Sequence, residues 1–129
     1  MRMRGVVSLS AGLMCLLGGT SQVLRAEEAR DIELRPLGSF RTGIFDGSAA
    51  EIAAHDPKSQ RLFVTNGAEE TVDVLDIRNP RQPPRIARID VSSIGASPNS
   101  VAVHDGIVAV AIEATIKTDP GALALFDVD

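Results

Sequence analysis

The sequence has 129 residues, of which 44% are hydrophobic and 23% charged, and this balance excludes an intrinsically disordered chain. The formal net charge is −4; without the first 26 residues, which hold three arginines and no acid, ten Lys and Arg face 17 Asp and Glu, giving −7. Nucleic acid is therefore not expected as a partner, because phosphate backbones require clustered Lys and Arg. A divalent cation or a basic partner suits this charge better.

The first segment has the form of a signal peptide. Arg2 and Arg4 precede an apolar run over residues 6–17, which is too short to span a bilayer. We expect a signal peptide over residues 1–26 and a flexible lead-in over 27–36, and hence an exported protein (periplasmic, secreted or at the cell surface) with no membrane span in the mature chain. A lipid anchor at Cys15 is the alternative, although Met14 is large where a small residue is expected.

The segment that follows the lead-in has the alternation and turn residues of short β-strands. Residues 37–43 are expected to form a strand that pairs elsewhere in the fold, and residues 51–56 a short strand ending at an Asp-Pro turn. Residues 61–77 then read as a hairpin rich in Val, Phe, Thr, Leu and Ile. Its turn begins at Asn66-Gly67, where we expect the positive φ angles of a tight turn.

The second half of the chain repeats this pattern after a proline-rich connection at 78–84 and a predicted edge strand at 85–91. Residues 100–105 match 51–56, residues 106–112 take the place of 61–66, and residues 122–128 take the place of 71–77. Four-strand units that recur at about 50 residues are typical of β-propeller blades.

We therefore predict an all-β fold in which residues 37–129 form about two four-stranded antiparallel blades of a larger ring. The blade-like repeats cover 51–91 and 99–129, and the second is incomplete, which suggests the N-terminal fragment of a longer protein. A self-contained eight-stranded sandwich is the alternative.

Several motifs of the chain resemble those of a known family. Phe63-Val64-Thr65-Asn66 is similar to the repeat of the YVTN-type, WD40-like β-propellers. The runs at 44–52 and 99–103, together with 108–113 and 119–121, are similar in order and composition to the bacterial surface propellers of the choice-of-anchor I family.

The resemblance spans about residues 37–129. It implies an exported seven-bladed propeller that is attached to cells by varied C-terminal devices or is released. Relatives are labelled surface glycoprotein-like or alkaline-phosphatase-like, so the resemblance implies two functions. The first is a binding or scaffolding module for an extracellular protein, a glycan or a small molecule; the second is a metal-dependent phosphoesterase or lactonase-like hydrolase.

Polar residues at the strand ends are the candidates for a binding site. In a blade, the innermost strand starts on the side where the second strand ends, so one rim should carry Glu51, Asn66, Asn99, Ser100 and Glu113. Two carboxylates with amide or hydroxyl oxygens suit Ca²⁺, and Glu51 and Glu113 are the predicted metal ligands. The alternative is that both are solvated charges and that Asn99 caps a turn.

Catalytic motifs are missing from the sequence. It has no GxSxG nucleophile elbow, no HExxH and no phosphate-binding loop, and the mature part has no cysteine. His55 and His104 each precede an Asp at a strand end, where a structural hydrogen bond is the expected role. We predict no catalytic residue in this part of the chain.

Overall fold

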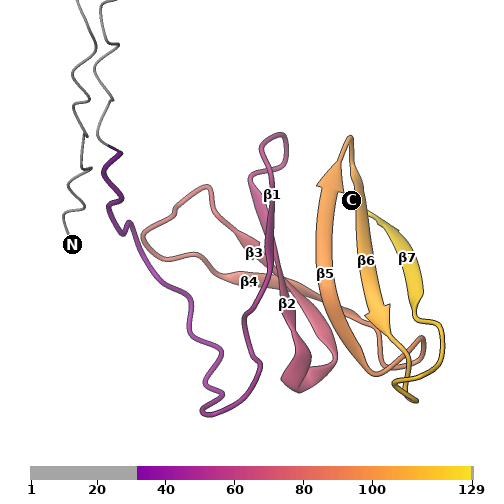
Figure 1. Ribbon diagram of the computed structural model, residues 1–129. Helices are drawn as coiled ribbons and strands as arrows, with labels where there is room; N and C mark the ends of the chain where they lie inside the picture. The colour runs from indigo at the N-terminus through magenta and orange to yellow at the C-terminus, as the bar shows by residue number, and fades with distance from the viewer. Residues whose placement is uncertain (1–31, 129) are drawn as a thin grey trace, which may run out of the picture. The chain divides into compact units, whose positions relative to one another are not determined.

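The computed structural model describes residues 32–128, and the residues from Leu34 onward form one compact unit. The predicted signal peptide therefore lies outside the described residues, as do residues 27–31 of the lead-in. Within the described part, no helix is long and apolar enough to cross a membrane. Two antiparallel sheets account for the regular structure, as Figure 1 shows. The elements are β1 (Ala53–Asp56), β2 (Arg61–Asn66), the short 3₁₀ helix η1 (Gly67–Glu69), β3 (Thr71–Asp76), β4 (Arg85–Asp90), β5 (Ser97–His104), β6 (Ile107–Glu113) and β7 (Ala122–Asp127).

Each sheet is a meander in which neighbours in sequence are neighbours in space. The first sheet has the order β1-β2-β3-β4 and the second the order β5-β6-β7. This confirms the predicted all-β class, and the two meanders are consistent with propeller blades. Residues 37–43, which were expected to form a strand, have none in the structure.

The β2–β3 hairpin forms where the sequence predicts it, but its turn differs from the prediction. Neither Asn66 (φ −126°) nor Gly67 adopts a positive φ; the left-handed residue is Glu70, at φ 56°. The reason is loop length. Four residues, 67–70, connect the strands instead of two, and a turn of 3₁₀ helix fills most of the connection. The Asn66 side chain accepts a hydrogen bond from the Glu69 N–H at 3.2 Å.

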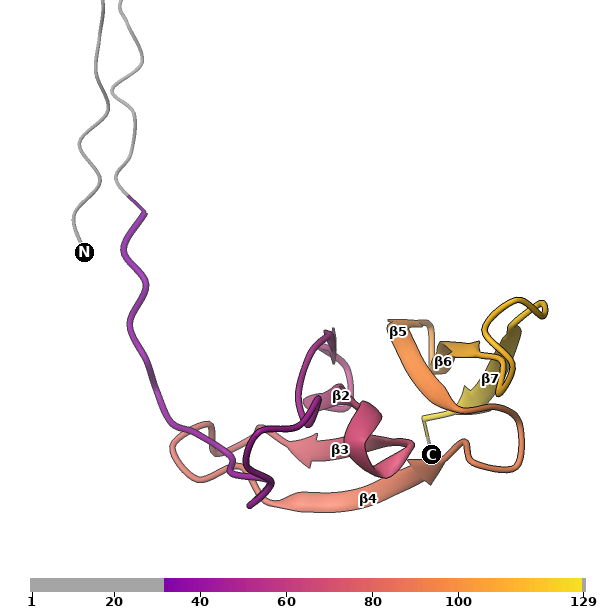
Figure 2. The same ribbon diagram turned by 60° about the horizontal axis from the view of Figure 1, so that its bottom comes forward.

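The hydrophobic core lies between the two sheets. Phe63, Val72 and Val74 of the first sheet pack in one cluster with Val108 and Val110 of the second, and all five are at most 5% exposed. Burying side chains of this size contributes about 1.5–3 kcal/mol each. Figure 2 shows the two sheets next to each other, and β5 makes the main contacts between them, with β1 and β2 of the first sheet.

The two chain segments that leave the sheets complete this core. Val91, directly after β4, is fully buried, and Val128, directly after β7, is 9% exposed. The Val128 carbonyl also accepts a hydrogen bond from the Arg61 guanidinium, which joins the end of β7 to the start of β2. The sheets are thus held in a fixed relation by both apolar and polar contacts.

Candidate functional site

One end of the two sheets brings together the loops that the sequence predicted as a binding rim. The segment before β1, the turn after β2 and the start of β5 meet around Gly67. A Cβ atom placed on Gly67 would lie 3.0 Å from the Ser97 Oγ and 3.4 Å from the Ser48 carbonyl oxygen. A methyl group at this position would require the Ser97 hydroxyl to move by a few tenths of an ångström, so the two sheets approach each other closely at Gly67.

The loop over residues 46–51 is fixed to the first sheet by its backbone. The Ser48 carbonyl accepts from the Ala68 N–H at 3.1 Å, and the Glu51 N–H donates to the Thr65 carbonyl at 3.3 Å. The Thr65 Oγ1 accepts from the Ile52 N–H at 3.0 Å, which places the start of β1. The loop is held at both ends, while its side chains stay available.

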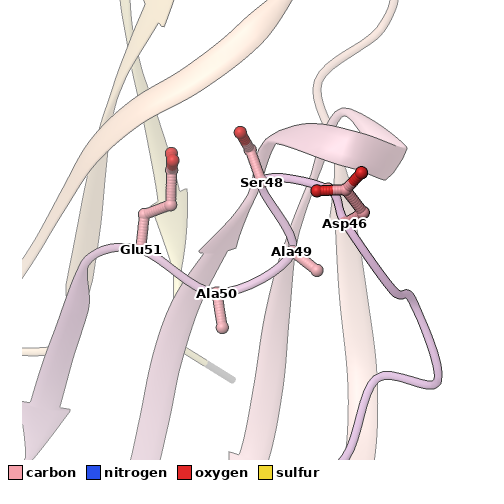
Figure 3. A pocket seen from close by; sticks show the side chains of 6 residues that line it. Asp46, Ser48, Ala49, Ala50 and Glu51 are labelled. Atoms are coloured by element: carbon pink, nitrogen blue, oxygen red, sulfur yellow. The ribbon is translucent and has the colours of Figure 1, made fainter.

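A shallow, open pocket lies along this loop. It is lined by residues 46–51, and its surface is mostly polar. Figure 3 shows the Ser48 and Glu51 side chains projecting to the same side of the loop, with Ala50 on the other side. Asp46, which adopts a positive φ of 55°, also presents its carboxylate near this pocket. Carboxylate and hydroxyl oxygens thus face solvent together.

The start of β5 and the end of β6, both in the second sheet, also lie at the rim. The register places Glu113, whose side chain is 31% exposed, opposite Ser97. The pairing of β5 with β6 shifts at Asn99, between Pro98 and Ser100, so Asn99 is a bulge residue and is exposed. Bulges commonly redirect a side chain near functional sites.

Ser100 belongs to a different surface. It pairs with Ala111 and lies on the face of the second sheet that points away from the core. Glu51, Asn99 and Glu113 therefore lie at the same end of the sheets, whereas Ser100 is displaced onto the exposed sheet face.

Asn66 is fully buried and its side chain is used inside the protein. Its amide nitrogen donates to Glu69 at 3.0 Å and to Asp73 at 3.3 Å, and its amide oxygen accepts from the Glu69 backbone. Because Asn66 is fully buried and donates both of its side-chain N–H groups inside the protein, its side chain is not accessible to a ligand.

The same contacts reveal a buried charge cluster that the sequence reasoning underestimated. Asp73 is 2% exposed and accepts from the Arg85 guanidinium at 3.2 Å and from the Arg88 Nε at 3.1 Å. Arg88 also pairs with Glu69 at 2.5 Å. The sequence alone predicts a pair between Asp73 and an Arg of a neighbouring strand as an exposed contact, which would contribute little to stability. The sequence did carry a signal for this burial. Asp73 stands between Val72 and Val74 in an apolar strand, and the next strand holds two arginines.

Carboxyl groups with lowered pKa values lie in turns. The pKa of Asp76 falls to about 2 because the Arg78 side chain and then its backbone N–H donate to this carboxylate. The Ser59 hydroxyl lowers the pKa of Asp56, and the Ser92 hydroxyl lowers that of Asp90. These shifts stabilise turns, and none of them singles out a reactive acid or base.

The histidines take no part in a shared site. The His104 Nε2 lies 3.3 Å from the Asp105 carboxylate, and both side chains are about nine-tenths exposed. The register places His55 opposite Leu62 and His104 opposite Ile107. Among residues 32–128, no three His, Cys, Asp or Glu side chains gather as a metal-binding group.

Comparison with protein families identifies the chain. The sequence model of the choice-of-anchor I domain matches residues 51–129, which is more than half of the chain. The chain belongs to the choice-of-anchor I family. This confirms the predicted family, and membership associates the chain with the cell surface. Neither the curated proteins nor the solved structures give a significant match.

Proposed function

We propose that this choice-of-anchor I chain is an exported binding and scaffolding module that recognises its ligand outside the cell through the rim of its two sheets. The observation that carries the proposal is the 46–51 loop. Its backbone is bonded to β2 and to the turn after it, while Asp46, Ser48 and Glu51 present oxygen atoms along one open pocket. Loops held by a rigid sheet scaffold and bearing exposed polar groups are the usual location of binding sites.

These oxygen atoms favour ligands that are coordinated by oxygen or that donate hydrogen bonds to it. Glu51 and Glu113 supply two carboxylates, and Asn99 supplies an amide, at the same end of the sheets. Hard oxygen donors of this kind suit Ca²⁺ among the common biological cations. The proposed ligand is therefore a Ca²⁺ ion together with, or followed by, a hydroxyl-rich molecule such as a glycan, which Ca²⁺ and carboxylates can both bind.

A binding screen on the full chain tests this function. Fluorescently labelled protein is applied to glycan and extracellular-protein arrays with Ca²⁺ and with a chelator. We expect a ligand that is retained by the wild type, lost in the double variant Glu51→Gln/Glu113→Gln, and retained by Asp119→Asn, which removes an exposed carboxylate from a loop outside the proposed set.

The same proteins separate binding from hydrolysis. Incubation with a chromogenic phosphate ester and a lactone should give no turnover above the buffer rate. Chelator-sensitive turnover that disappears in the double variant would replace the binding function with the hydrolase alternative. Array binding that is identical in the wild type and the double variant would show that Glu51 and Glu113 do not bind the ligand.

A further inference from the structure

The short helix η1 is tied to the buried charge cluster through Glu69. The Glu69 Oε2 accepts a hydrogen bond from the Asn66 side-chain amide at 3.0 Å and lies 2.5 Å from the Arg88 Nη2. The Glu69 backbone N–H donates in turn to the Asn66 Oδ1 at 3.2 Å. Both the backbone and the side chain of Glu69 are therefore held by residues of β2 and β4.

Arg88 connects this carboxylate to Asp73. Its Nε donates to the Asp73 Oδ1 at 3.1 Å, while its Nη2 pairs with Glu69. A guanidinium group can do this because its donors point in several fixed directions. Arg85 donates to the same Asp73 oxygen at 3.2 Å, but its guanidinium lies over the Phe40 ring and not at η1. Of the two arginines on Asp73, Arg88 is thus the one that reaches the rim turn.

The helix η1 also holds the middle of the 46–51 loop. The Ala68 N–H of η1 donates to the Ser48 carbonyl at 3.1 Å. The end of the loop is bonded to β2 instead, where the Ile52 N–H donates to the Thr65 Oγ1 at 3.0 Å. The position of Ser48 therefore depends on η1, whereas the position of Ile52 depends on the sheet.

From these contacts we propose that Arg88 is a positioning residue for the rim: it fixes η1 through Glu69 and thereby places the Ser48 part of the 46–51 loop. The proposal rests on the binding function proposed above, because this loop carries the proposed binding groups. The Arg88 and Glu69 side chains are 36% and 35% exposed. They are partly shielded from solvent, so their interaction is screened less than that of a fully exposed ion pair.

Hydrogen exchange of the full chain without ligand, followed amide by amide in NMR spectra, tests this role. Arg88→Met keeps an apolar side chain but removes the guanidinium group. The Ala68 amide should then exchange about threefold faster or more, because η1 opens more often. The Ile52 amide should keep its rate. Glu69→Ala, which leaves the backbone N–H on Asn66, should have the same effect at Ala68.

Arg85→Met is the matched control. It removes the other guanidinium group from Asp73 and leaves the contact between Arg88 and Glu69 in place. It should lower the urea midpoint, as Arg88→Met does, but it should leave the exchange of Ala68 unchanged. This comparison separates positioning from a general contribution to stability, because a general loss would accelerate exchange at Ala68 in both variants.

A Ca²⁺ titration of the same proteins connects the contact to binding. Arg88→Met should weaken Ca²⁺ binding at the rim by about twofold to fivefold, and Arg85→Met should bind as the wild type does.

Three results would overturn the proposal. They are an Ala68 amide whose exchange is unchanged in Arg88→Met, an equal acceleration in Arg85→Met, and a rim that binds Ca²⁺ equally well with and without Arg88. A wild type that binds no Ca²⁺ but shows the expected exchange would support the placement of the loop by Arg88 and count against the proposed cation site alone.

Discussion

Replacing Asp73 by Asn should destabilise the protein more than any other single change of a charged residue. Asp73 is 2% exposed and accepts hydrogen bonds from Arg85, Arg88 and Asn66, at 3.2, 3.1 and 3.3 Å. Asn conserves the volume, but it removes the negative charge that faces both guanidinium groups. Because both arginines contact Oδ1, the new NH₂ group takes the place of Oδ2 and meets the Asn66 amide donor. Breaking a fully buried ion pair costs about 3–5 kcal/mol.

The two arginines reduce that cost. Their side chains are 31% and 36% exposed, so each guanidinium regains some water when its partner is lost. We therefore expect a loss of about 2–3 kcal/mol in the free energy of unfolding. For a domain of this size, this corresponds to a fall of about 2 M in the urea midpoint.

Urea unfolding of the full chain, followed by circular dichroism, measures this loss. Asp119→Asn, at an exposed loop position, is the control and should change the free energy by less than about 0.5 kcal/mol. Arg85→Met and Arg88→Met should each cost less than Asp73→Asn, because one arginine then remains on the carboxylate. An Asp73→Asn variant as stable as the control would refute the assignment of a structural role to the cluster.

Three further predictions concern the core, the rim and the turns. Phe63→Ala should cost about 3–5 kcal/mol in urea unfolding, because Phe63 is 2% exposed in the cluster between the sheets, whereas Phe45→Ala, at a 96% exposed position, should change little. Gly95→Ala should cost about 1–3 kcal/mol by the same assay, because its Cβ would lie 2.4 Å from the Glu113 carbonyl oxygen; a variant as stable as the wild type would contradict this close approach. Asp76→Asn should be less stable than the wild type at neutral pH, and the difference should vanish as the pH falls from about 4 to about 2. The sign follows from the lowered pKa of about 2 in the folded chain against 3.8: the stabilisation is present above the unfolded value and is lost as the folded carboxylate is protonated. A difference between the two proteins that is independent of pH would count against it.

The strands were predictable because their signal is local. Alternating Phe63, Thr65, Val72 and Val74 indicate one buried face, and the structure buries all four between the sheets. The family, too, followed from short ordered motifs. The local pattern could not predict the conformation of the β2–β3 turn, because a four-residue connection can adopt several conformations and the positive φ falls on Glu70.

The rim was predicted in part, and the residues that depart from the prediction do so for long-range reasons. Asn66 ends a strand as expected. Its side-chain amide, however, donates hydrogen bonds to Glu69 of η1 and to Asp73 of β3, and it does not face the rim. Ser100 leaves the rim because of the bulge at Asn99, which changes the face on which the next residue lies. Ser48 and Ser97 were missed, and only their shared approach to Gly67 reveals them.

The most direct test of the binding rim is a titration of ¹⁵N-labelled full chain with Ca²⁺, followed by amide chemical shifts. We expect saturable shifts confined to the 46–51 loop, Gly67, Ser97, Asn99 and Glu113, and their loss in Glu51→Gln/Glu113→Gln. Amides at the opposite end of the sheets, such as Arg78 beside Asp76, should not move. Saturable shifts at that opposite end, or a spectrum unchanged by Ca²⁺, would contradict the proposed cation site at the rim.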